Sequence, residues 1–277
     1  MEMLRTARKG GYAVPAFAAI DLQSIKAIVK VCEDENAPCL LESHEYTVRA
    51  QGEHYLVAIA ETAARTARVP VALHLDHGKS FDLIVRCLRA GFSSVMIDAS
   101  EHDFEKNVAL TRRVVEVAHA MGVGVEAELG KVGQASVEPT EEERRAALTD
   151  PAEAAQFVEL TGVDALAVSV GTAHGAYKYE PRLELGLLAE IARRVSIPLV
   201  LHGGSGTPGL ERTPPLGIAK VNIFTDLQVP IRNKVREIME TQDLERLFAA
   251  TIWGQANAAA EPVIRDRIRT LGAAGKA

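Results

Sequence analysis

Three histidines, His77, His174 and His202, each lie where a short apolar run gives way to small or polar residues. The runs read VALHLDHG, ALAVSVGTAHG and PLVLHGGSG, and each is typical of a buried parallel strand followed by an imidazole and at least one glycine. The carboxyl ends of parallel strands gather on one face of a sheet or barrel, where ligands bind. A single histidine beside a strand end is more often structural. Three in equivalent contexts predict a metalloenzyme, because three neutral imidazoles suit Zn²⁺ or a similar divalent ion and leave open positions for a substrate.

Acidic side chains end other predicted strands on the same face. Asp76 directly precedes His77, while Asp98 and Glu128 close the runs SVMID and VEAE. A carboxylate beside a metal ligand can hold the imidazole or transfer a proton as a general acid or base, although Asp76 can also cap a turn. Asp98 and Glu128 can bind a second cation or orient the ligands, and Asp98 can equally cap a helix.

The segment HGGSG places glycines and a serine directly after His202. Glycines let backbone N–H groups approach an oxyanion closely, and a serine hydroxyl adds a donor. In barrels, the loops after the seventh and eighth strands commonly form a phosphate site, although a glycine-rich turn is often only a tight turn. Further polar groups on the same rim are Asn222 and Thr225 in VNIFTD, with Gly175 and Lys178 in HGAYK. A metal beside a phosphate pocket predicts a phosphorylated substrate whose carbonyl the metal polarises.

The elements that must position these residues alternate along the whole chain. Apolar runs without strict alternation, typical of strands buried on both faces, alternate with amphipathic helical patterns. The predicted strands are Ala13–Ala18, Pro38–Glu42, Val69–Asp76, Ser93–Asp98, Val123–Glu128, Ala165–Val170, Ile197–His202 and Ala219–Phe224. Eight such units in about 250 residues predict an α/β fold of the (β/α)₈ barrel type. A doubly wound sheet is the alternative, but no GxGxxG follows the first strand.

Three segments depart from the regular pattern. The loop of residues 130–149, GKVGQASVEPTEEERRAALT, is long enough to be a functional lid, and Thr140 with Glu143 predicts a capping box inside it. After HGGSG, the stretch TPGLERTPPL predicts a shortened seventh helix, since a proline inside a helix costs about 3 kcal/mol. The chain from Gln228 onward exceeds the eighth unit and predicts extra carboxyl-terminal helices that serve oligomer packing. We expect residues 1–277 to form one domain.

The composition excludes several classes of protein. The 277 residues are 47% hydrophobic and 25% charged, as in a soluble globular protein, and no run approaches the roughly 20 apolar residues of a membrane span. The amino terminus has no apolar stretch typical of a secretory signal. Three cysteines without a CxxC pair indicate a reducing compartment, so we expect a cytoplasmic protein. A net charge of −6 with 5% aromatic residues argues against a nucleic-acid partner. It does not argue against an anionic substrate, because phosphate is held by local groups.

Seven motifs in order, YAVPAF, LDHG, SVMIDAS, VEAELG, GTAHG, HGGSG and KVNIFTD, resemble the class II, metal-dependent ketose-bisphosphate aldolases over nearly the whole chain. This family includes fructose-bisphosphate and tagatose-bisphosphate aldolases. The resemblance implies a lyase of carbohydrate metabolism or glycolysis. Such an enzyme reversibly cleaves fructose 1,6-bisphosphate or tagatose 1,6-bisphosphate to dihydroxyacetone phosphate and an aldehyde such as glyceraldehyde 3-phosphate. Similar proteins are homodimers or homotetramers.

The resemblance also implies roles for individual residues. His77, His174 and His202 would bind the catalytic Zn²⁺, and Asp76 would donate the proton to the aldehyde oxygen. Two acids, Asp98 and Glu128, would match positions that hold a second, non-catalytic divalent or monovalent cation in some members. The residues that would hold dihydroxyacetone phosphate are Gly175, Lys178, Gly203, Gly204, Ser205, Asn222, Ile223, Phe224 and Thr225.

Some features depart from the family pattern. A GG-x-E-[DE] stretch, whose acid assists proton abstraction, is missing after VEAELG, and Glu138 is the candidate to replace it. Phe224 occupies a rim position that is often polar, so the aldehyde partner stays open. Alternatives are an aldolase for another phosphorylated keto-substrate such as 6-phospho-5-dehydro-2-deoxygluconate, a zinc hydrolase, and a non-catalytic sugar-phosphate binder. A Schiff-base mechanism is disfavoured, because Lys220 is the one lysine in a strand-end motif.

Overall fold

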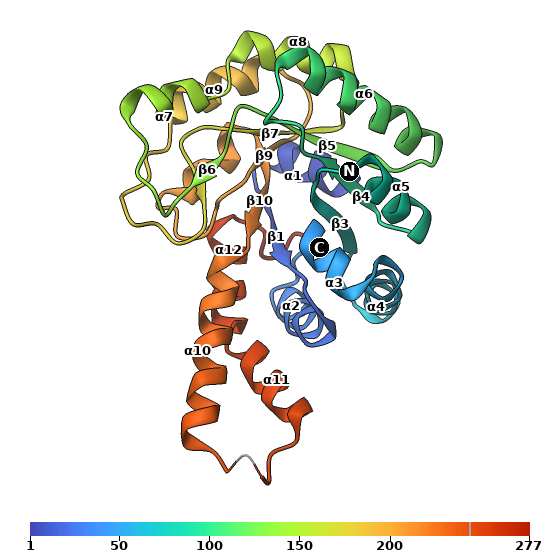
Figure 1. Cartoon of the computed structure of the whole chain (residues 1–277), viewed down its shortest axis with the longest axis vertical. Helices are drawn as coiled ribbons and strands as arrows, with labels where there is room; N and C mark the ends of the chain where they lie inside the picture. Colours follow the sequence, from blue (N-terminus) through green and yellow to red (C-terminus); the bar gives the residue numbers. More distant parts are fainter. Residues whose placement is uncertain (244) are drawn as a thin grey trace.

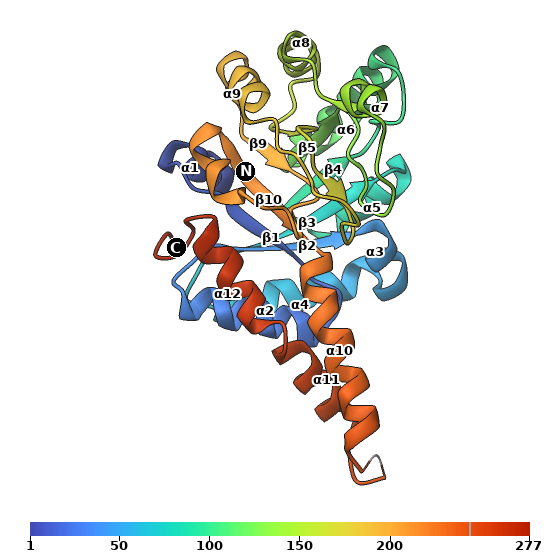
Figure 2. The ribbon, with the colours of Figure 1, turned by 90° about the vertical axis from the view of Figure 1, so that its left-hand side faces the viewer.

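A closed parallel barrel lies at the centre of the computed structural model, which describes residues 1–243 and 245–277 (Figures 1 and 2). Within these residues its eight strands are β1 (Val14–Ala18), β2 (Cys39–His44), β3 (Val71–Gly78), β4 (Ser94–Ile97), β5 (Gly124–Leu129), β7 (Ala165–Val168), β9 (Leu199–Leu201) and β10 (Ile218–Ile223). They pair around the barrel in the order β1, β10, β9, β7, β5, β4, β3, β2. The predicted (β/α)₈ barrel is therefore confirmed, with a strand at each of the predicted positions.

Helices surround the barrel (Figure 1). Their bounds are α1 (Glu2–Gly10), α2 (Leu22–Asp34), α3 (Glu45–Gln51), α4 (Glu53–Thr66), α5 (Phe81–Ala90), α6 (Phe104–Ala120), α7 (Glu141–Ala147), α8 (Pro151–Thr161), α9 (Leu185–Arg194), α10 (Thr225–Thr241), α11 (Ala249–Ala258) and α12 (Glu261–Thr270). Side-chain oxygens of Ser80, Asp103 and Asp150 accept amide hydrogen bonds at the starts of α5, α6 and α8. These caps satisfy amides that have no partner inside the helix. None of the helices in the described ranges is long and apolar enough to cross a membrane.

The segment after β9 has no regular seventh helix. Two short 3₁₀ turns, η1 (Leu210–Arg212) and η2 (Pro214–Leu216), replace it. Consecutive prolines at 214 and 215 lack the N–H groups that an α-helix would need. The predicted truncation is therefore confirmed.

The 130–149 loop carries structure of its own. Its strand β6 (Gly133–Gln134) pairs with β8 (Ala173–His174), a two-residue strand outside the barrel. The helix α7 begins with the predicted capping box, in which the Glu143 N–H donates to Thr140 Oγ1 and the Thr140 N–H donates to Glu143 Oε2. The pairing of β6 with β8 fixes the loop against the segment that contains His174.

The carboxyl-terminal helices extend beyond the eighth unit, as predicted. Helix α10 runs away from the barrel and α11 packs beside it, so the two form an arm that projects from the body of the molecule (Figures 1 and 2). Helix α12 then packs against α2 and β1. Arg265 and Arg269 of α12 form ion pairs with Glu35, which follows α2. These contacts fix the end of the chain on the barrel.

Candidate metal centre

The three predicted histidines converge at the mouth of the barrel. The ring centroids of His77 and His202 lie 4.6 Å apart. The ring centroid of His174 lies 5.0 Å from that of His77 and 5.9 Å from that of His202. One ring nitrogen from each residue lies within 4.8 Å of the other two. Among the described residues, the buried Nε2 of His174 has no hydrogen-bond partner, and a buried polar atom without a partner needs an explanation. The donor set and this atom fit a divalent metal ion.

The backbone of β3 explains how Asp76 and His77 both reach the site. Adjacent residues on a regular strand point to opposite faces, but His77 has a left-handed φ of 48° and the pairing of β3 with β4 shifts between Leu75 and Gly78. The shift leaves Asp76 Oδ1 4.0 Å from His77 Nε2. Gly78 is required here, because a Cβ would lie 2.6 Å from the Met96 carbonyl oxygen. A left-handed non-glycine residue costs about 1–3 kcal/mol and is often found at functional sites.

His174 lies beyond the sixth predicted strand, on a short strand of its own. It does not end the barrel strand β7, which stops at Val168, but lies on β8. The 202–206 loop packs against the segment that contains His174. A Cβ on Gly203 would lie only 2.4 Å from the Ala173 carbonyl oxygen. The hydroxyl of Tyr177 accepts a hydrogen bond from the Ala173 N–H at 2.7 Å and lies 3.1 Å from Thr207 Oγ1. Tyr177, which no sequence motif singled out, therefore links the two loops.

Asp98 orients His77. Its Oδ2 lies 2.8 Å from His77 Nδ1, and its Oδ1 accepts a hydrogen bond from the Ser100 hydroxyl at 2.8 Å. Asp98 caps no helix in the described residues, since Asp103 caps α6. Burial opposes ionisation of Asp98, but the hydrogen bond and positive charge of His77 and the hydrogen bonds from Ser100 together outweigh it and hold the Asp98 pKa well below its usual range. His77 therefore turns its Nε2 toward the centre.

Glu126, which was not among the residues predicted from the sequence, contacts His202. Glu126 Oε1 lies 2.9 Å from His202 Nε2, so Nδ1 of the same ring faces the centre, 2.9 Å from His77 Nε2. Lys220 Nζ donates to both carboxylate oxygens of Glu126, at 2.8 and 3.0 Å. The signal was available, because Glu126 and Glu128 are two residues apart and so lie on the same face of their strand.

Burial and charge set the protonation of the ligands. Burial, reinforced by the positive charge of His77, lowers the pKa of His174 to about 4, and the same causes lower that of His202. Burial would also lower the pKa of His77, but Asp76 and Asp98 outweigh it and raise the pKa to about 9. His174 and His202 are thus neutral at pH 7 and available to a metal, whereas His77 is protonated on both ring nitrogens and positively charged in the metal-free protein.

Asp76 is buried beside the three imidazoles. Asn222 Nδ2 donates to its Oδ1 at 2.9 Å. Burial raises the pKa of Asp76, but the positive charge of His77, the adjacent His202 ring and the positive charge of Lys220 together hold it well below the usual range. Asp76 is therefore an ionised carboxylate next to the centre.

Glu128 forms a second cluster with Asp98 and His77, whose ligand atoms lie within 4.8 Å of one another. Its Oε1 accepts a hydrogen bond from the Val132 N–H at 3.4 Å, and its buried Oε2 has no partner among the described residues. Burial raises the pKa of Glu128 to about 7. The cluster has the composition of a cation site, as the sequence indicated for Asp98 and Glu128.

The glycine-rich loop after β9 lies against the end of β10. The Gly204 N–H donates to the Asn222 carbonyl oxygen at 3.2 Å, and Ser205 Oγ accepts from the Asp226 N–H at 3.1 Å. Gly203 adopts a φ of 68°, which a residue with a side chain rarely adopts. These contacts bring the loop to the first turn of α10, where the helix dipole favours an anion.

The other predicted substrate residues lie around this loop. Gly175 follows His174 with a φ of 101°, and Ile223 is buried as the last residue of β10. Thr225 begins α10, and Phe224 before it is 42% exposed. Lys178 is exposed and is fixed through its backbone, whose N–H donates to the Ala135 carbonyl oxygen at 3.1 Å.

Two histidines outside the predicted set lie near the centre. His44 ends β2, in register with Asp76, and its ring centroid is 5.5 Å from that of His77. The ring of His74 is buried, with Nδ1 2.8 Å from Ser94 Oγ. His44 was not selected, because no glycine follows it. The register of β2 with β3, which only the structure provides, places it at the rim.

Known proteins resemble this chain over its whole length. A family model described as fructose-bisphosphate aldolase class-II matches residues 1–276. The fructose-bisphosphate aldolase of Thermus caldophilus is 39% identical over 302 residues, which cover 100% of this chain and 98% of that protein. The fructose-bisphosphate aldolase of Helicobacter pylori is 37% identical over 301 residues, which cover 99% of this chain and 98% of that protein. The crystal structure of the YdjI aldolase from Escherichia coli K12 superposes with a TM-score of 0.88 at 31% identity, covering 100% of this chain and 97% of that one. The chain therefore belongs to the class II fructose-bisphosphate aldolase family and is a metal-dependent carbon–carbon lyase.

Proposed function

We propose that this aldolase reversibly cleaves a ketose 1,6-bisphosphate, either fructose 1,6-bisphosphate or tagatose 1,6-bisphosphate. The products are dihydroxyacetone phosphate and an aldehyde such as glyceraldehyde 3-phosphate. The observation that carries the proposal is the juxtaposition of the three imidazoles with the glycine-rich 202–206 loop. His77, His174 and His202 would hold Zn²⁺, which their nitrogen donors suit. When bound, the metal supplies a Lewis acid that polarises the ketose carbonyl.

Asp76 is the proposed proton-transfer residue. Because its pKa is far below the usual range, it is ionised at neutral pH and can accept the proton of the C4 hydroxyl as the C3–C4 bond breaks. In the direction of condensation, the same carboxyl returns the proton to the aldehyde oxygen. The hydrogen bond from Asn222 fixes Asp76 Oδ1 for this task.

The phosphate of dihydroxyacetone phosphate would lie between the 202–206 loop, Gly175 and the start of α10. Backbone N–H groups of Gly203 and Gly175, with the Ser205 hydroxyl, are donors of the kind that bind phosphate oxygens. Gly204, whose N–H donates to the Asn222 carbonyl oxygen, would hold the loop against β10 at the phosphate. The left-handed φ of Gly203 and Gly175 supports this role, since such turns bring amides close to a ligand. Lys178 would contribute its ammonium charge from the loop that follows His174.

We propose Glu138 as the base that removes the C–H proton of dihydroxyacetone phosphate during condensation. Two other acids of the 130–149 loop are occupied, because Glu141 pairs with Arg144 and Glu143 completes the capping box. Glu138 is exposed. The pKa of Tyr179, in the loop that follows His174, is raised by burial, by Tyr177 and by the charge of Glu138, which therefore lies near that loop. A Glu138→Gln variant should bind Zn²⁺ normally but exchange the C–H proton of dihydroxyacetone phosphate with solvent about 100-fold or more slowly. An unchanged exchange rate would exclude Glu138.

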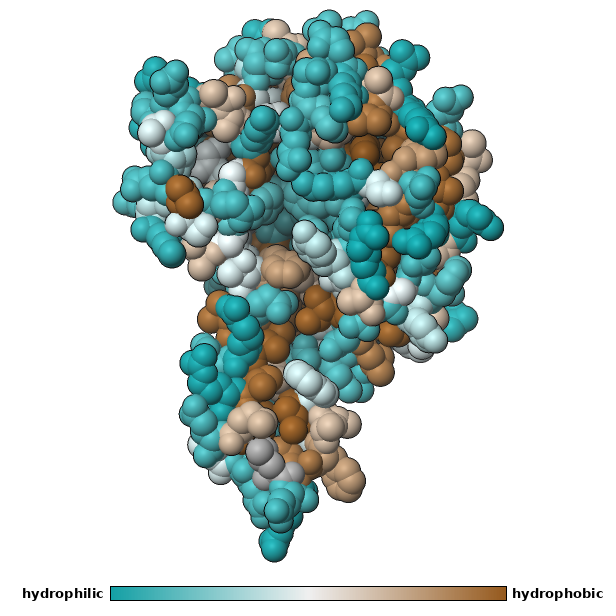
Figure 3. All heavy atoms as spheres, in the orientation of Figure 1, coloured by the Kyte–Doolittle hydropathy of each residue, from teal (hydrophilic) through white to brown (hydrophobic). Residues whose placement is uncertain are grey.

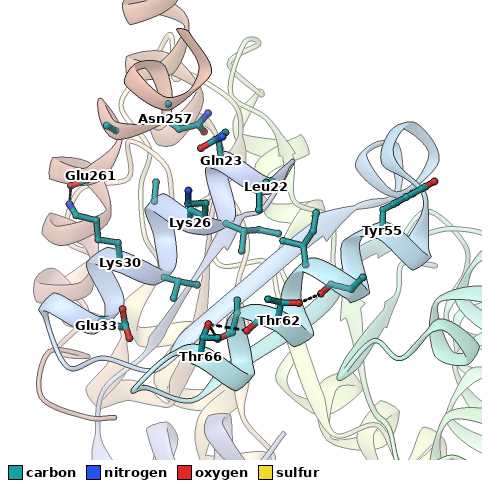
Figure 4. A pocket seen from close by; sticks show the side chains of 18 residues that line it. Leu22, Gln23, Lys26, Lys30, Glu33, Tyr55, Thr62, Thr66, Asn257 and Glu261 are labelled. Atoms are coloured by element: carbon teal, nitrogen blue, oxygen red, sulfur yellow. Dashed lines mark hydrogen bonds and ion pairs between the residues drawn. The ribbon is translucent and has the colours of Figure 1, made fainter. Parts of the chain in front are cut away.

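We also propose that the protein forms a homodimer or homotetramer through the arm of α10 and α11. A groove of about 740 Å³ lies between α2, α4 and the base of the arm (Figure 4). Its apolar wall includes Leu22, 49% exposed. The arm carries the exposed side chains of Met239, Phe248 and Trp253, and apolar atoms run along it in Figure 3. A projecting apolar arm and an apolar groove on one chain suit a second copy, because exposed apolar patches of this kind mark interfaces.

Sedimentation velocity tests the self-association. The wild-type protein should sediment as an oligomer at micromolar concentration, and Phe248→Glu should shift it toward the monomer. The matched control is Tyr46→Glu, which changes an exposed aromatic residue outside the groove and the arm. A wild-type protein that sediments as a monomer would overturn this part of the proposal.

A substrate panel tests the function itself. Metal-reconstituted protein is assayed with fructose 1,6-bisphosphate, tagatose 1,6-bisphosphate and 6-phospho-5-dehydro-2-deoxygluconate, and kcat/KM is compared. We expect cleavage of a ketose 1,6-bisphosphate that EDTA abolishes and Zn²⁺ restores. Activity that survives both chelation and a His174→Ala substitution would refute the proposed metal centre. A preference for the deoxygluconate substrate would refute the proposed substrate and leave the reaction class intact.

A further inference from the structure

Beneath the metal centre, the interior of the barrel contains a buried ion pair that the proposed reaction does not use. Lys220 of β10 and Glu126 of β5 are both fully buried and meet at 2.8 and 3.0 Å. Removing two charges from water costs several kcal/mol per ion, so such a pair is weak evidence for stability alone. A Lys–Glu pair buried inside the barrel therefore requires another reason.

The contacts of Glu126 supply that reason. Its Oε1 faces His202 Nε2 at 2.9 Å, and its Oε2 lies 3.5 Å from the Nε2 of His74. A carboxylate only accepts hydrogen bonds, so His202 must direct an Nε2–H at Glu126. The neutral ring then has its lone pair on Nδ1, the nitrogen that faces the other two imidazoles.

Lys220 fixes the direction in which Glu126 points. Its ammonium group contacts both carboxylate oxygens, whereas His202 contacts one of them. Rotation of the carboxylate away from His202 would break both contacts with Lys220 as well. Second-sphere partners of this kind commonly set the orientation and tautomer of a metal-bound histidine.

We propose that the Lys220–Glu126 pair is a positioning device for His202, in which Lys220 holds the Glu126 carboxylate so that His202 presents Nδ1 to the metal. This inference rests on the proposed function only in taking His202 as a ligand. Neither Lys220 nor Glu126 contacts the substrate or the metal in this scheme. Lys220 accordingly has a structural partner and is no nucleophile, which agrees with a metal route and not a Schiff base.

The experiment compares two double variants that differ in one property. Lys220→Met/Glu126→Leu removes both charges and the acceptor, whereas Lys220→Met/Glu126→Gln removes both charges but keeps an acceptor oxygen beside His202. Neither variant buries an unpaired charge, and replacing a buried ion pair by uncharged residues of similar volume is often tolerated. Far-ultraviolet circular dichroism and thermal unfolding of the metal-free proteins verify that both fold.

The readout is Zn²⁺ affinity by competition with a chromophoric chelator, together with the visible spectrum of the Co²⁺-substituted proteins. We expect Lys220→Met/Glu126→Leu to bind Zn²⁺ about 10- to 100-fold more weakly than wild type, with an altered Co²⁺ spectrum. The affinity of Lys220→Met/Glu126→Gln should lie within about threefold of wild type, because its acceptor is retained. Equal affinities of the two double variants would overturn the role of Glu126.

The single variant Glu126→Gln tests Lys220. Because Lys220 contacts both carboxylate oxygens, the amide nitrogen of the glutamine would face the ammonium group in either orientation, and both are donors. The glutamine must then move away from Lys220, and with it from His202. We therefore expect Glu126→Gln to bind Zn²⁺ more weakly than Lys220→Met/Glu126→Gln, so that the second substitution rescues the first. A single variant that binds as tightly as the double variant would overturn the role of Lys220. Failure of the proposed function appears separately, as a wild-type protein that binds Zn²⁺ without cleaving a ketose bisphosphate.

Discussion

Asp98 Oδ2 and His77 Nδ1 lie 2.8 Å apart at the carboxyl ends of neighbouring strands β4 and β3. The hydrogen bond between them holds the imidazole so that its second nitrogen faces His174 and His202. The same carboxylate belongs to the cluster with Glu128. Asp98 thus connects the two candidate cation sites at the mouth of the barrel, the three histidines and the cluster of His77, Asp98 and Glu128.

Substituting Asp98 should weaken metal binding without unfolding the barrel. In Asp98→Ala, His77 loses its acceptor and can rotate, so we expect Zn²⁺ affinity to fall about 10- to 100-fold. Chelator competition measures the affinity. The control is Asp103→Ala, which removes the cap of α6 and should cost about 1 kcal/mol of stability while leaving Zn²⁺ affinity unchanged. Equal losses of affinity in the two variants would contradict the role of Asp98.

Zn²⁺ binding should release protons at neutral pH. The pKa of His77 is about 9 in the metal-free protein, so this imidazole is protonated at pH 7 and must lose its proton to become a ligand. His174, with a pKa of about 4, is already neutral. The apparent affinity for Zn²⁺ should therefore rise by up to about tenfold per pH unit between about pH 6 and the His77 pKa of about 9 and then level off.

Calorimetry in buffers of different ionisation enthalpy measures the released protons directly. We expect about one proton per Zn²⁺ at pH 7 and fewer at pH 9. Release that does not change with pH over this range would show that His77 is not the residue that gives up the proton.

Asp76→Ala should separate turnover from metal binding. Asp76 lies beside the ligands without being one of the three imidazoles, so the variant should retain its Zn²⁺ while kcat falls about 10²- to 10⁴-fold. Metal content by elemental analysis and steady-state kinetics check the two effects. A variant with the wild-type rate would show that another group transfers the proton.

The sequence predicted the elements of the barrel well because buried parallel strands and their following glycines leave a strong local signal. The eight apolar runs, the capping box at Thr140 and the proline-shortened segment after β9 all depend on neighbouring residues. The two-residue strand β8 that carries His174 was not predicted, because its pairing with β6 brings together residues about 40 positions apart.

The partners of the metal ligands were harder to predict. Asp98 could be assigned three roles from its position: binding a second cation, orienting a ligand or capping a helix. Its hydrogen bond to His77 favours the second role, and it caps none of the described helices. Glu126 and Lys220 lie 94 positions apart in sequence and meet across the interior of the barrel. No local pattern encodes such a pair, since strand order and register decide which inward side chains meet. The positive φ of His77, which brings Asp76 into the site, is likewise a tertiary effect.

The close contact between Gly203 and Ala173 gives a final prediction, with Gly206 as its matched control. Both glycines have left-handed φ angles, 68° and 69°, so an alanine at either position costs about 1 kcal/mol in backbone strain. A Cβ at position 203 would lie 2.4 Å from the Ala173 carbonyl oxygen, whereas at position 206 the nearest atom, Tyr177 Cδ2, is 3.5 Å away.

Gly203→Ala must therefore displace the segment that carries His174, and we expect it to weaken Zn²⁺ binding and raise KM. Gly206→Ala should lose a similar amount of stability from strain and keep its Zn²⁺ affinity. If the two variants lost metal equally, the packing of the 202–206 loop against Ala173 would not be what positions His174.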